Sequence, residues 1–337
     1  MQAPGRFPGV RGFAEAGDLS GMVSDALGGR PRIVGVDRLR GGSKKGVYRV
    51  RLDGGEAASV IVYRWSDEED FWPGTREDDA TDPFAPASGI APFLAARRRL
   101  DEVGARVPRV LWADDTGQRY AADVAVVEDV PGGTLEALFE TGPARADAAL
   151  ADLARTLDLM HRHHAPRHGR VDLLDRGGVA LGSSCEQLVL DRARRDLDEA
   201  AGRDTRIGTV RDRLDERLRE LREPVLPRAE CGLIHGELGP DHVLVSAEGR
   251  AVLIDIEGLM YFDVEWEHVF LRIRFGERYA ALSRPGLDQR RLDLYLLAMR
   301  LSLVAGPLRL LDGDFPDRAL MRGIAEHNLR EALALLP

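Results

Sequence analysis

Lysine is scarce in this sequence. Its 337 residues include 45 arginines but only two lysines, Lys44 and Lys45, which stand together in the segment GGSKKGVYRV at residues 41–50. A lysine ammonium is a compact point charge on a flexible stem, whereas arginine presents a planar fork, so the pair indicates a site that needs a point charge. An exposed hairpin turn accounts for the same residues equally well, because glycines of this kind suit an ordinary turn.

Cysteine, long apolar runs and common nucleotide fingerprints are also rare or absent. Cys185 and Cys231 are the only cysteines and match no metal-ligand spacing, so we expect two ordinary thiols in a reducing compartment. No apolar run is long enough to span a bilayer, and the first residues do not resemble a signal peptide, so we expect a cytoplasmic protein without a membrane partner. Neither G-x-x-x-x-G-K-[ST] nor G-x-G-x-x-G occurs.

Negative charge dominates and is concentrated in one segment. The net charge of −9 argues against nucleic acid as a partner, because phosphate backbones are held by surplus positive charge. Residues 66–92 hold eight acidic residues, one arginine and four prolines, which predicts an irregular insertion. It is either a solvated surface loop or a lid over a cationic substrate, with Phe71 and Trp72 as its apolar anchor.

The two parts of the chain differ in their apolar periodicity. Residues 47–52 alternate between apolar side chains and arginines, as a half-buried strand does. Further along the chain, apolar residues recur three and four apart, as an amphipathic helix requires. This order predicts an α+β protein with an N-terminal lobe over 1–127, a hinge over 128–134 and a helical lobe over 135–337. Five strands are expected in the first lobe, at 32–40, 47–52, 58–65, 108–115 and 122–130.

Two histidine-containing segments resemble metal sites without fitting one. The sequence HRHH at 161–164 lies at a predicted helix end before Pro166, and no acid follows at ligand spacing, so we expect a solvated or structural role. We interpret His268 as a helix residue rather than a ligand.

The chemically richest segment is LIHGELGPDHVLVSAEGRAVLIDIEGLMYFDVEWEH, residues 233–268. Its pattern predicts a loop, a strand at 243–245, a turn, a second strand at 251–254 and a second loop. Such a hairpin would bring three side chains of the first loop close to two acids of the second, namely His235, Glu237, His242, Asp255 and Glu257. Together they offer a proton acceptor and hard ligands for a magnesium ion that bridges nucleotide phosphates.

This segment resembles the catalytic region of the aminoglycoside phosphotransferase and choline kinase superfamily. That pattern reads His-Gly-Asp, four further residues, Asn, and then Ile-Asp-Phe/Trp-Glu. The similarity extends to GGSKKGVYRV as the nucleotide loop, VVEDVPGGTLEALF as the hinge and LARTLDLMH as the first long helix, and it covers most of 30–270. The resemblance implies a bilobal protein-kinase-like fold with a five-stranded antiparallel first lobe and a mainly helical second lobe.

The resemblance also implies roles for individual residues. Glu237 stands where the family has its catalytic Asp and would take the substrate proton, with His235 beside it in the catalytic motif. Asp255 stands at the metal-binding Asp, and His242 replaces the Asn, as in the macrolide kinases. Glu257 is a third candidate metal ligand, or it braces the loop.

The change from Asp to Glu at position 237 needs compensation. An extra methylene moves the carboxylate by about 1 Å, and a misplacement of that size can cost on the order of 100-fold in rate. Glu267 also stands where the family pattern has an Asp, one that braces the catalytic loop, so two lengthenings are correlated. Asp241 is the alternative proton acceptor if the loop register differs.

The expected nucleotide site lacks a familiar ion pair. A kinase-like fold carries a Lys on its third strand and a Glu on the next helix, but residues 58–65 contain no Lys and 93–100 contain no Glu. We therefore expect Lys44 or Lys45 to reach the phosphates. The predicted nucleotide contacts are Gly42, Ser43, Lys44, Lys45 and Arg64, with Glu128 and Val130 at the hinge.

The resulting hypothesis is an O-phosphotransferase that uses ATP, or alternatively GTP, with Mg²⁺. It would phosphorylate a hydroxyl of a small molecule, which the acidic residues suggest is cationic. The arginine-for-lysine composition suggests a high-GC genome and therefore an antibiotic or related secondary metabolite as acceptor. The alternative is a nucleotide-binding pseudokinase that acts as a regulatory or interaction module. The sequence leaves a monomer and a homodimer open.

Overall fold

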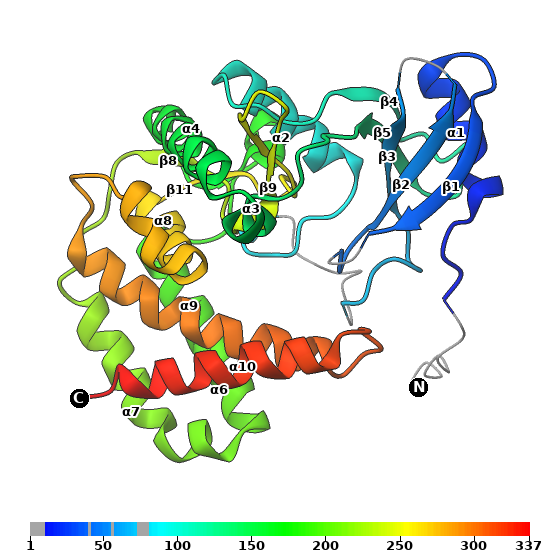
Figure 1. The fold of residues 1–337 in the computed structure, drawn as a ribbon. Coiled ribbons are helices and arrows are strands. Elements are labelled where there is room, and N and C mark those ends of the chain that lie inside the picture. Colours follow the sequence, from blue (N-terminus) through cyan, green and yellow to red (C-terminus); the bar gives the residue numbers. More distant parts are fainter. Residues whose placement is uncertain (1–10, 40–41, 55–56, 73–80) are drawn as a thin grey trace.

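The computed structural model describes residues 11–39, 42–54, 57–72 and 81–337, which form a smaller sheet-based lobe and a larger helical lobe (Figure 1). The expected α+β, bilobal arrangement is confirmed. Within the described residues, no helix combines the length and the apolar character that crossing a membrane requires.

A five-stranded sheet forms the first lobe, in the order β1-β2-β3-β5-β4, with every neighbouring pair antiparallel. All five expected strands are present and differ from the expected bounds by a few residues. They are β1 (Arg32–Arg38), β2 (Gly46–Asp53), β3 (Ser59–Trp65), β4 (Val110–Asp114) and β5 (Asp123–Glu128).

Strand alternation gives this sheet two buried faces. Tyr48, Val50 and Leu52 of β2 lie on one face, as the period of two predicts, and pack with helix α1 (Ala16–Leu27). Helix α1 was not predicted, although the apolar spacing of its buried residues Leu19, Met22 and Val23 was a usable signal. The opposite face carries Ile61, Tyr63 and Trp65 and joins the main hydrophobic core.

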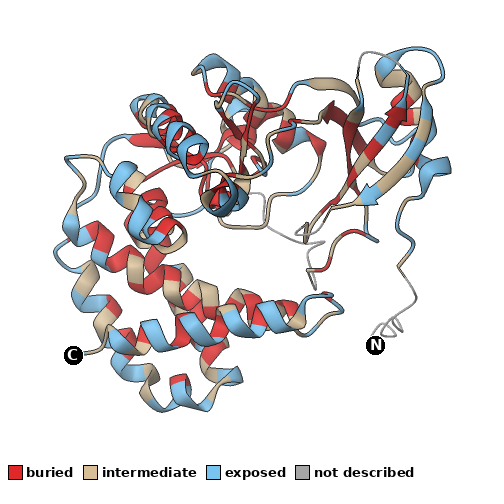
Figure 2. Ribbon diagram, viewed as in Figure 1, coloured by how far each residue is buried: buried red, intermediate tan, exposed pale blue. Residues whose placement is uncertain are grey.

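The second lobe is mainly helical, and its buried residues lie mostly on the sides of the helices that face one another (Figure 2). The helix α2 (Ile90–Glu102) packs between the sheet and this lobe. The remaining helices are α3 (Leu135–Thr141), α4 (Pro143–Arg162), α5 (Val171–Asp175), α6 (Cys185–Arg203), α7 (Thr205–Arg222), α8 (Val264–Phe275), α9 (Gln289–Leu310) and α10 (Arg318–Ala334), with 3-10 segments η2 (Pro240–His242) and η3 (Gly276–Ala281).

Two small sheets support the loops of the second lobe. One has the strand order β6-β8-β11-β7, and the other is the hairpin of β9 and β10. Their bounds are β6 (His164–Ala165), β7 (Gly169–Arg170), β8 (Cys231–Ile234), β9 (Val243–Val245), β10 (Ala251–Leu253) and β11 (Met260–Phe262).

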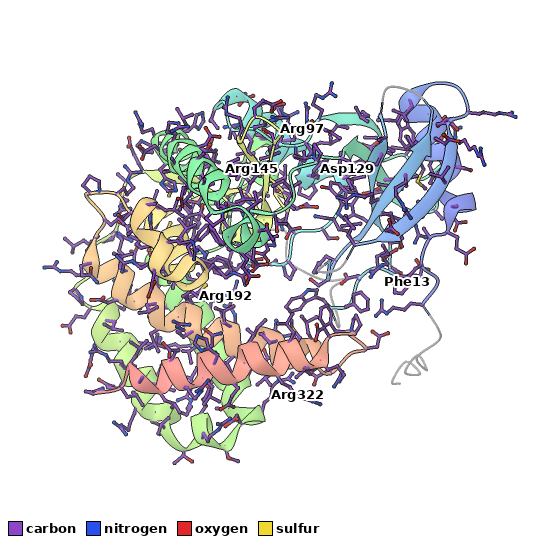
Figure 3. The ribbon with its side chains drawn as sticks, viewed as in Figure 1. Phe13, Arg97, Asp129, Arg145, Arg192 and Arg322 are labelled. Carbon is purple, nitrogen blue, oxygen red and sulfur yellow. The ribbon has the colours of Figure 1, made fainter. Side chains whose placement is uncertain are left out.

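The segment between β5 and α3 is anchored at both ends. Asp129 (labelled in Figure 3) accepts hydrogen bonds from Arg49 Nε at 2.8 Å and from Ser59 Oγ at 2.6 Å. Gly132 packs directly on β9, since a Cβ there would lie 1.6 Å from the carbonyl oxygen of Val245. We propose residues 128–134 as the hinge, with the two lobes on either side.

The described parts of the acidic insertion are packed rather than free in solvent; residues 73–80 lie outside the described residues. Phe71 is buried and meets the ring of Phe315 edge to face, at a centroid distance of 5.5 Å. The Phe71 N–H donates to Ser43 O at 2.8 Å, and Trp72 Nε1 donates to Ser43 Oγ at 3.0 Å. The expectation of a solvated loop is therefore wrong for this part, because its two aromatic side chains join the nucleotide loop to the second lobe.

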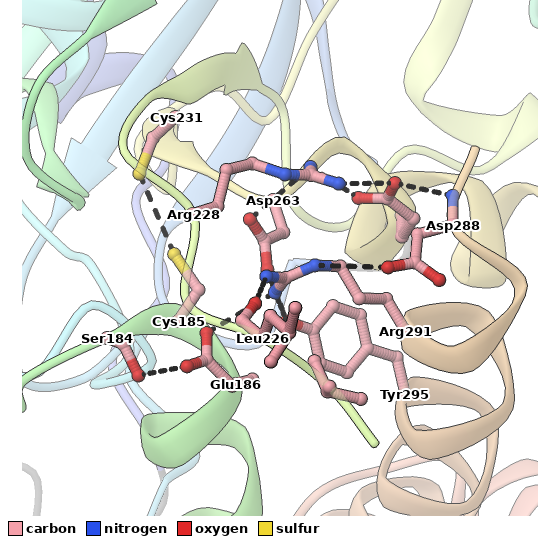
Figure 4. Close-up of polar contacts among 12 residues, drawn as sticks. Ser184, Cys185, Glu186, Leu226, Arg228, Cys231, Asp263, Asp288, Arg291 and Tyr295 are labelled. Carbon is pink, nitrogen blue, oxygen red and sulfur yellow. Dashed lines mark hydrogen bonds and ion pairs between the residues drawn. The ribbon is translucent and has the colours of Figure 1, made fainter. Parts of the chain in front are cut away.

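A buried ion cluster joins α9 to the junction of β11 and α8 (Figure 4). The Arg291 side chain is only 2% exposed and pairs with Asp263 and, at 3.3 Å, with Glu186. Arg291 also donates to the carbonyl oxygen of Leu226, and the Tyr295 hydroxyl donates to Asp263. Each polar group in the cluster thus has a partner in place of water.

We expect Arg291→Met to destabilise the fold by about 3–5 kcal/mol, because it leaves Asp263 and Glu186 buried with an uncompensated charge. Arg290→Met is the matched control, since the Arg290 side chain is exposed and its guanidinium donates to Pro224 O, and it should change stability by less than about 0.5 kcal/mol. Urea-induced unfolding measures both. Equal losses in the two variants would contradict a structural role for the cluster.

Candidate active site

The β9–β10 hairpin brings two loops together, as predicted from the sequence. Val243 pairs with Leu253 in an antiparallel register, and the Ile254 N–H donates to His242 O at 3.0 Å. The second strand ends at Leu253 rather than at residue 254. As a result, the loop that follows β8 and the loop that follows β10 lie side by side.

Glu267 of α8 holds the first loop from behind. It is fully buried and accepts the backbone N–H of His235 at 2.6 Å and that of Gly236 at 3.3 Å. Burial raises the pKa of Glu267 to about 7, although the backbone donors act in the opposite direction. Gly236 has φ of 93°, a backbone conformation that suits glycine. The bracing contact expected of Glu267 is confirmed.

His235 is buried and joins the two loops. Its side chain is 2% exposed, its Nε2–H donates to Ile254 O at 2.9 Å, and its ring stacks on that of His242. Burial lowers the pKa of His235 to about 4, so the ring is neutral near pH 7. The predicted catalytic role of His235 is corrected to a positioning role, because the ring is turned into the protein.

Glu237 is the carboxylate of the first loop that faces outward. It is exposed in the angle between the loops, where desolvation by the surrounding protein and the nearby charge of Asp255 raise its pKa. The alternative acceptor, Asp241, is instead paired with Arg274 at 2.6 Å. Of the two acids, Glu237 is the more exposed, and Asp241 is held in an ion pair.

Lys45 provides a buried ionic contact between the lobes. Its ammonium lies 2.7 Å from Asp255 Oδ1 and also contacts Glu257 Oε1, and the residue is 7% exposed. Asp255 is the only non-glycine residue among those described with a positive φ, 59°, a conformation that Asp tolerates better than most residues. The turn therefore directs the Asp255 carboxylate toward the nucleotide loop.

The charges in this cluster depend on one another. Burial alone would lower the pKa of Lys45, but the carboxylates of Asp255 and Glu257 outweigh it and raise the pKa. The Lys45 charge in turn holds the pKa of Asp255 well below its usual range. Burial also opposes the charge on His242, yet Asp255 and Asp241 raise the pKa of that ring.

The predicted metal ligands are only partly assembled. Among the residues that the structure describes, no three His, Cys, Asp or Glu side chains are grouped closely enough to hold a metal ion. His242 Nδ1 donates to Glu237 O at 2.8 Å, and His242 Nε2 lies 3.7 Å from Asp255. Asp255 and Glu257, however, already share the Lys45 ammonium, which shows that the pair suits a cation. Two carboxylates fit a magnesium ion whose other ligands are phosphates and waters.

The nucleotide loop has a compact shape that needs glycine. A Cβ on Gly42 would lie 2.4 Å from the carbonyl oxygen of Lys45, so no larger residue fits there. Lys44 points differently from Lys45: its Nζ is 3.9 Å from Asp70 and 5.9 Å from the centre of the Trp72 ring. Of the two lysines, only Lys45 contacts the second loop.

Arg64 lies on the wrong face of the sheet for the predicted nucleotide contact, and this prediction is corrected. Because side chains alternate along β3, Tyr63 and Trp65 face the main core, whereas Arg64 faces the other way. The Arg64 guanidinium lies 3.7 Å from Glu68 and 3.6 Å from the buried Glu69.

Aromatic side chains lie between β3 and α2, where a kinase-like fold has its Lys–Glu pair. Tyr63 meets Phe93 of α2 edge to face at a centroid distance of 5.6 Å, and Trp65 packs on the same ring. Lys45 Nζ lies 5.3 Å from the centre of the Tyr63 ring. The Lys45 ammonium thus reaches Asp255 and Glu257 from the nucleotide loop, and the third strand has Tyr63 beside it instead of a lysine.

Glu128 and Val130, the two predicted nucleotide contacts in the hinge, have different surroundings. The Glu128 carboxylate pairs with Arg106 at 3.2 Å, and the Glu128 N–H donates to Arg109 O at 2.9 Å. Val130 is buried at the start of the hinge. The contacts of Glu128 are therefore with residues next to the sheet. Val130 remains the candidate for a contact with the nucleotide base through its backbone.

Sequence reasoning missed Arg192 of α6, which is labelled in Figure 3. Arg192 donates to Ser302 Oγ at 2.9 Å and to Phe84 O at 3.2 Å, and its positive charge partly opposes the rise in the pKa of Glu237. The alternation of charges over 191–223 was interpreted as a solvated face, and nothing in that pattern distinguishes one arginine from its neighbours.

Known proteins resemble the chain over most of its length. The model of the phosphotransferase enzyme family matches residues 36–301. A thermostable mutant of the aminoglycoside phosphotransferase APH(4)-Ia has a similar structure, with a TM-score of 0.60 and 16% identity, covering 93% of this chain and 98% of that one. The GDP and kanamycin complex of APH(2")-IIia gives a TM-score of 0.59 and 17% identity, covering 94% and 97%. At these identities the likeness shows the fold. No curated protein matches the sequence.

We expect the stability contributed by the Lys45–Asp255 pair to be lost on acidification. Because the pKa of Asp255 is lowered in the folded chain, this stability is present above the unfolded pKa of about 4 and disappears as the pH falls below it. The difference in unfolding free energy between the wild type and Asp255→Asn should therefore shrink from pH 6 toward pH 3. Urea unfolding across this range tests it, with the exposed Asp115→Asn as control. A difference that is constant with pH would contradict the pairing.

Proposed function

Because the chain belongs to the phosphotransferase enzyme family, whose model matches residues 36–301, we propose that it is a kinase that phosphorylates a hydroxyl group of a small molecule with ATP. GTP is the alternative donor. The acceptor that we propose is an antibiotic or a related secondary metabolite.

The observation that carries this proposal is the meeting of three groups at the two loops. Glu237 provides an outward-facing carboxylate, Asp255 provides an acidic side chain on the adjacent loop, and Lys45 brings a positive charge from the nucleotide loop. A proton acceptor, a carboxylate for a cation and a phosphate-binding ammonium are the groups that phosphoryl transfer needs, since catalysis there is mainly positioning and charge stabilisation.

In the proposed reaction, Glu237 orients the acceptor hydroxyl and receives its proton. The bond between the γ-phosphorus and the bridging oxygen of the nucleoside diphosphate breaks, and a bond from that phosphorus to the acceptor oxygen forms. Glu237 must be ionised for this role, and the nearby positive charges of His242, Arg192 and Lys44 favour that form.

We propose that Asp255 and Glu257 hold Mg²⁺, with nucleotide phosphates and water completing its shell. When bound, the ion would neutralise charge on the phosphates. His242 adds a ligand only where its ring is neutral. Lys45 would then exchange its two carboxylate partners for phosphate oxygens, and the nucleotide base would meet the backbone at Val130. Structures similar to this chain are complexes with ADP and hygromycin B and with GDP and kanamycin, which supports nucleotide and small-molecule binding here.

The proposal of a cationic acceptor rests on the acids near Glu237, for which the acceptor would compete with the basic side chains that already contact them. Asp241 and Asp255 lie on the same two loops, and Asp70 of the insertion borders the nucleotide loop through Lys44. An amino group on the acceptor would be attracted to this side of the site.

The pseudokinase alternative is favoured by one observation, the occupation of Asp255 and Glu257 by Lys45. A pseudokinase would bind nucleotide and raise the melting temperature by mass action, without forming product. A screen with magnesium nucleotide and a panel of aminoglycosides, macrolides, nucleosides and amino alcohols, read by mass increase, separates the two functions.

With an acceptor found in this way, Glu237→Ala should lower turnover by about 10²- to 10⁴-fold, because it removes the proton acceptor. Nucleotide affinity should remain nearly unchanged, and the wild-type rate should rise with pH through a pKa above that of an ordinary glutamate. Asp241→Ala is the matched control. Loss of turnover in Asp241→Ala but not in Glu237→Ala would reject the assignment and identify Asp241 as the base.

The two lysines provide a second test. Lys45→Met should weaken nucleotide binding by roughly 10- to 100-fold, the value of a charge-assisted hydrogen bond to phosphate. Lys44→Met should change it by less than about threefold, because the Lys44 ammonium lies near Asp70 and Trp72 rather than near the acids of the second loop. Calorimetric titration with the magnesium nucleotide measures both affinities. The reverse order would show that Lys44 is the phosphate-binding lysine.

A further inference from the structure

A pocket in the helical lobe lies outside the proposed active site. It has a volume of about 370 Å³ and lies between α4, α8 and the segment that follows η3. This volume is within the range of small-molecule sites. Residues on its walls include His161, His268 and Arg284, and none of the residues assigned above to phosphoryl transfer lines it.

Several buried nitrogens on this pocket have no hydrogen-bond partner among the residues that the structure describes. They are both ring nitrogens of His161, Nε2 of His268 and Nη1 of Arg284. His161 is 2% exposed and His268 is 1% exposed, so the rings are buried in the walls. Buried polar groups are nearly always paired, and an unpaired one is costly. Their convergence on one pocket therefore points to a bound partner.

The chemistry of these groups indicates what that partner carries. His268 Nδ1 lies 3.0 Å from the Tyr279 hydroxyl, and when this hydroxyl donates to Nδ1 the ring proton is on Nε2, which becomes a donor. Burial, together with the charge of Arg284, lowers the pKa of both histidines, so their rings are neutral. The walls of the pocket thus contain one ring N–H donor on each neutral histidine, together with the guanidinium of Arg284.

The other charged residues on the walls leave the pocket with a net positive charge. Arg155 and Arg162 also line the pocket, and Asp158 is the single acid on it. Asp158 lies 3.6 Å from Arg162, and Arg155 pairs with Asp152. A metal ion would be repelled by the arginines and would find only two histidines and a paired acid as ligands. The net positive charge favours an anion.

We propose that this pocket binds a small molecule through an oxyanion group, a carboxylate or a phosphate. Arg284 pairs with the negative charge, and His161 and His268 donate to the oxygens. The site is next to the brace of the catalytic loop, since His268 directly follows Glu267. On the other side, the backbone oxygen of His161 lies 3.1 Å from the position of a Cβ on Gly232, in the strand that leads to His235.

The test is a titration of the full chain with inorganic phosphate and, separately, with malonate, followed by NMR of ¹⁵N-labelled histidine rings. The signals of His161 and His268, assigned with His161→Phe and His268→Phe, should shift and saturate with at least one of the two anions. Arg284→Gln should weaken that binding by roughly 10- to 100-fold, since it removes the charged donor. Phosphate acting alone identifies a phosphate ligand, and malonate acting alone identifies a carboxylate.

Two control variants make the result specific. Arg322→Gln, an exposed arginine on α10 (Figure 3), and Lys45→Met, in the proposed nucleotide site, should both leave the anion affinity unchanged. The proposal fails if neither anion moves the two histidine signals, which would mean that the pocket holds water only. It also fails if Lys45→Met rather than Arg284→Gln abolishes the shifts, or if zinc moves the signals and the anions do not.

Discussion

The arrangement of the candidate active site depends on one ammonium, that of Lys45, between the carboxylates of Asp255 and Glu257. Two carboxylates this close repel each other unless a cation lies between them, and the repulsion grows as water is excluded. Lys45 supplies that cation from the opposite lobe. In the proposed reaction, the phosphates of an incoming nucleotide compete with the two acids for Lys45, so nucleotide binding and release of the acids would be linked.

The position of this lysine follows from the packing around β3. Tyr63 and Phe93 form an apolar contact between the sheet and α2. At this contact α2 carries an aromatic ring in place of a buried acid, so a lysine on the strand would have no partner there. A lysine at position 63 would place an ammonium in that aromatic cluster at a high desolvation cost. From the tight turn after Gly42, the Lys45 side chain instead passes beside the Tyr63 ring and reaches the acids.

Local periodicity predicted the five strands of the first lobe, the helical character of the second lobe and the β9–β10 hairpin, because each depends on near neighbours in the chain. It did not separate Lys44 from Lys45, since two consecutive residues on a turn diverge according to how the turn packs. The direction of Arg64 required the register of β3, and the docking of Phe71 on Phe315 required a contact between residues far apart in sequence. Such contacts depend on the tertiary structure and leave no periodic signal.

The contacts of Glu267 bear on whether Glu237 can act as a base. Relative to an Asp, each of these residues extends its carboxylate by about 1 Å, a displacement that matters for catalysis. Glu267 still accepts the backbone N–H groups of His235 and Gly236, so the loop that carries Glu237 is held by the longer brace. The loop is thus held from behind, joined to its neighbour by His235 and left with an outward carboxylate, as the role of base that we propose for Glu237 requires.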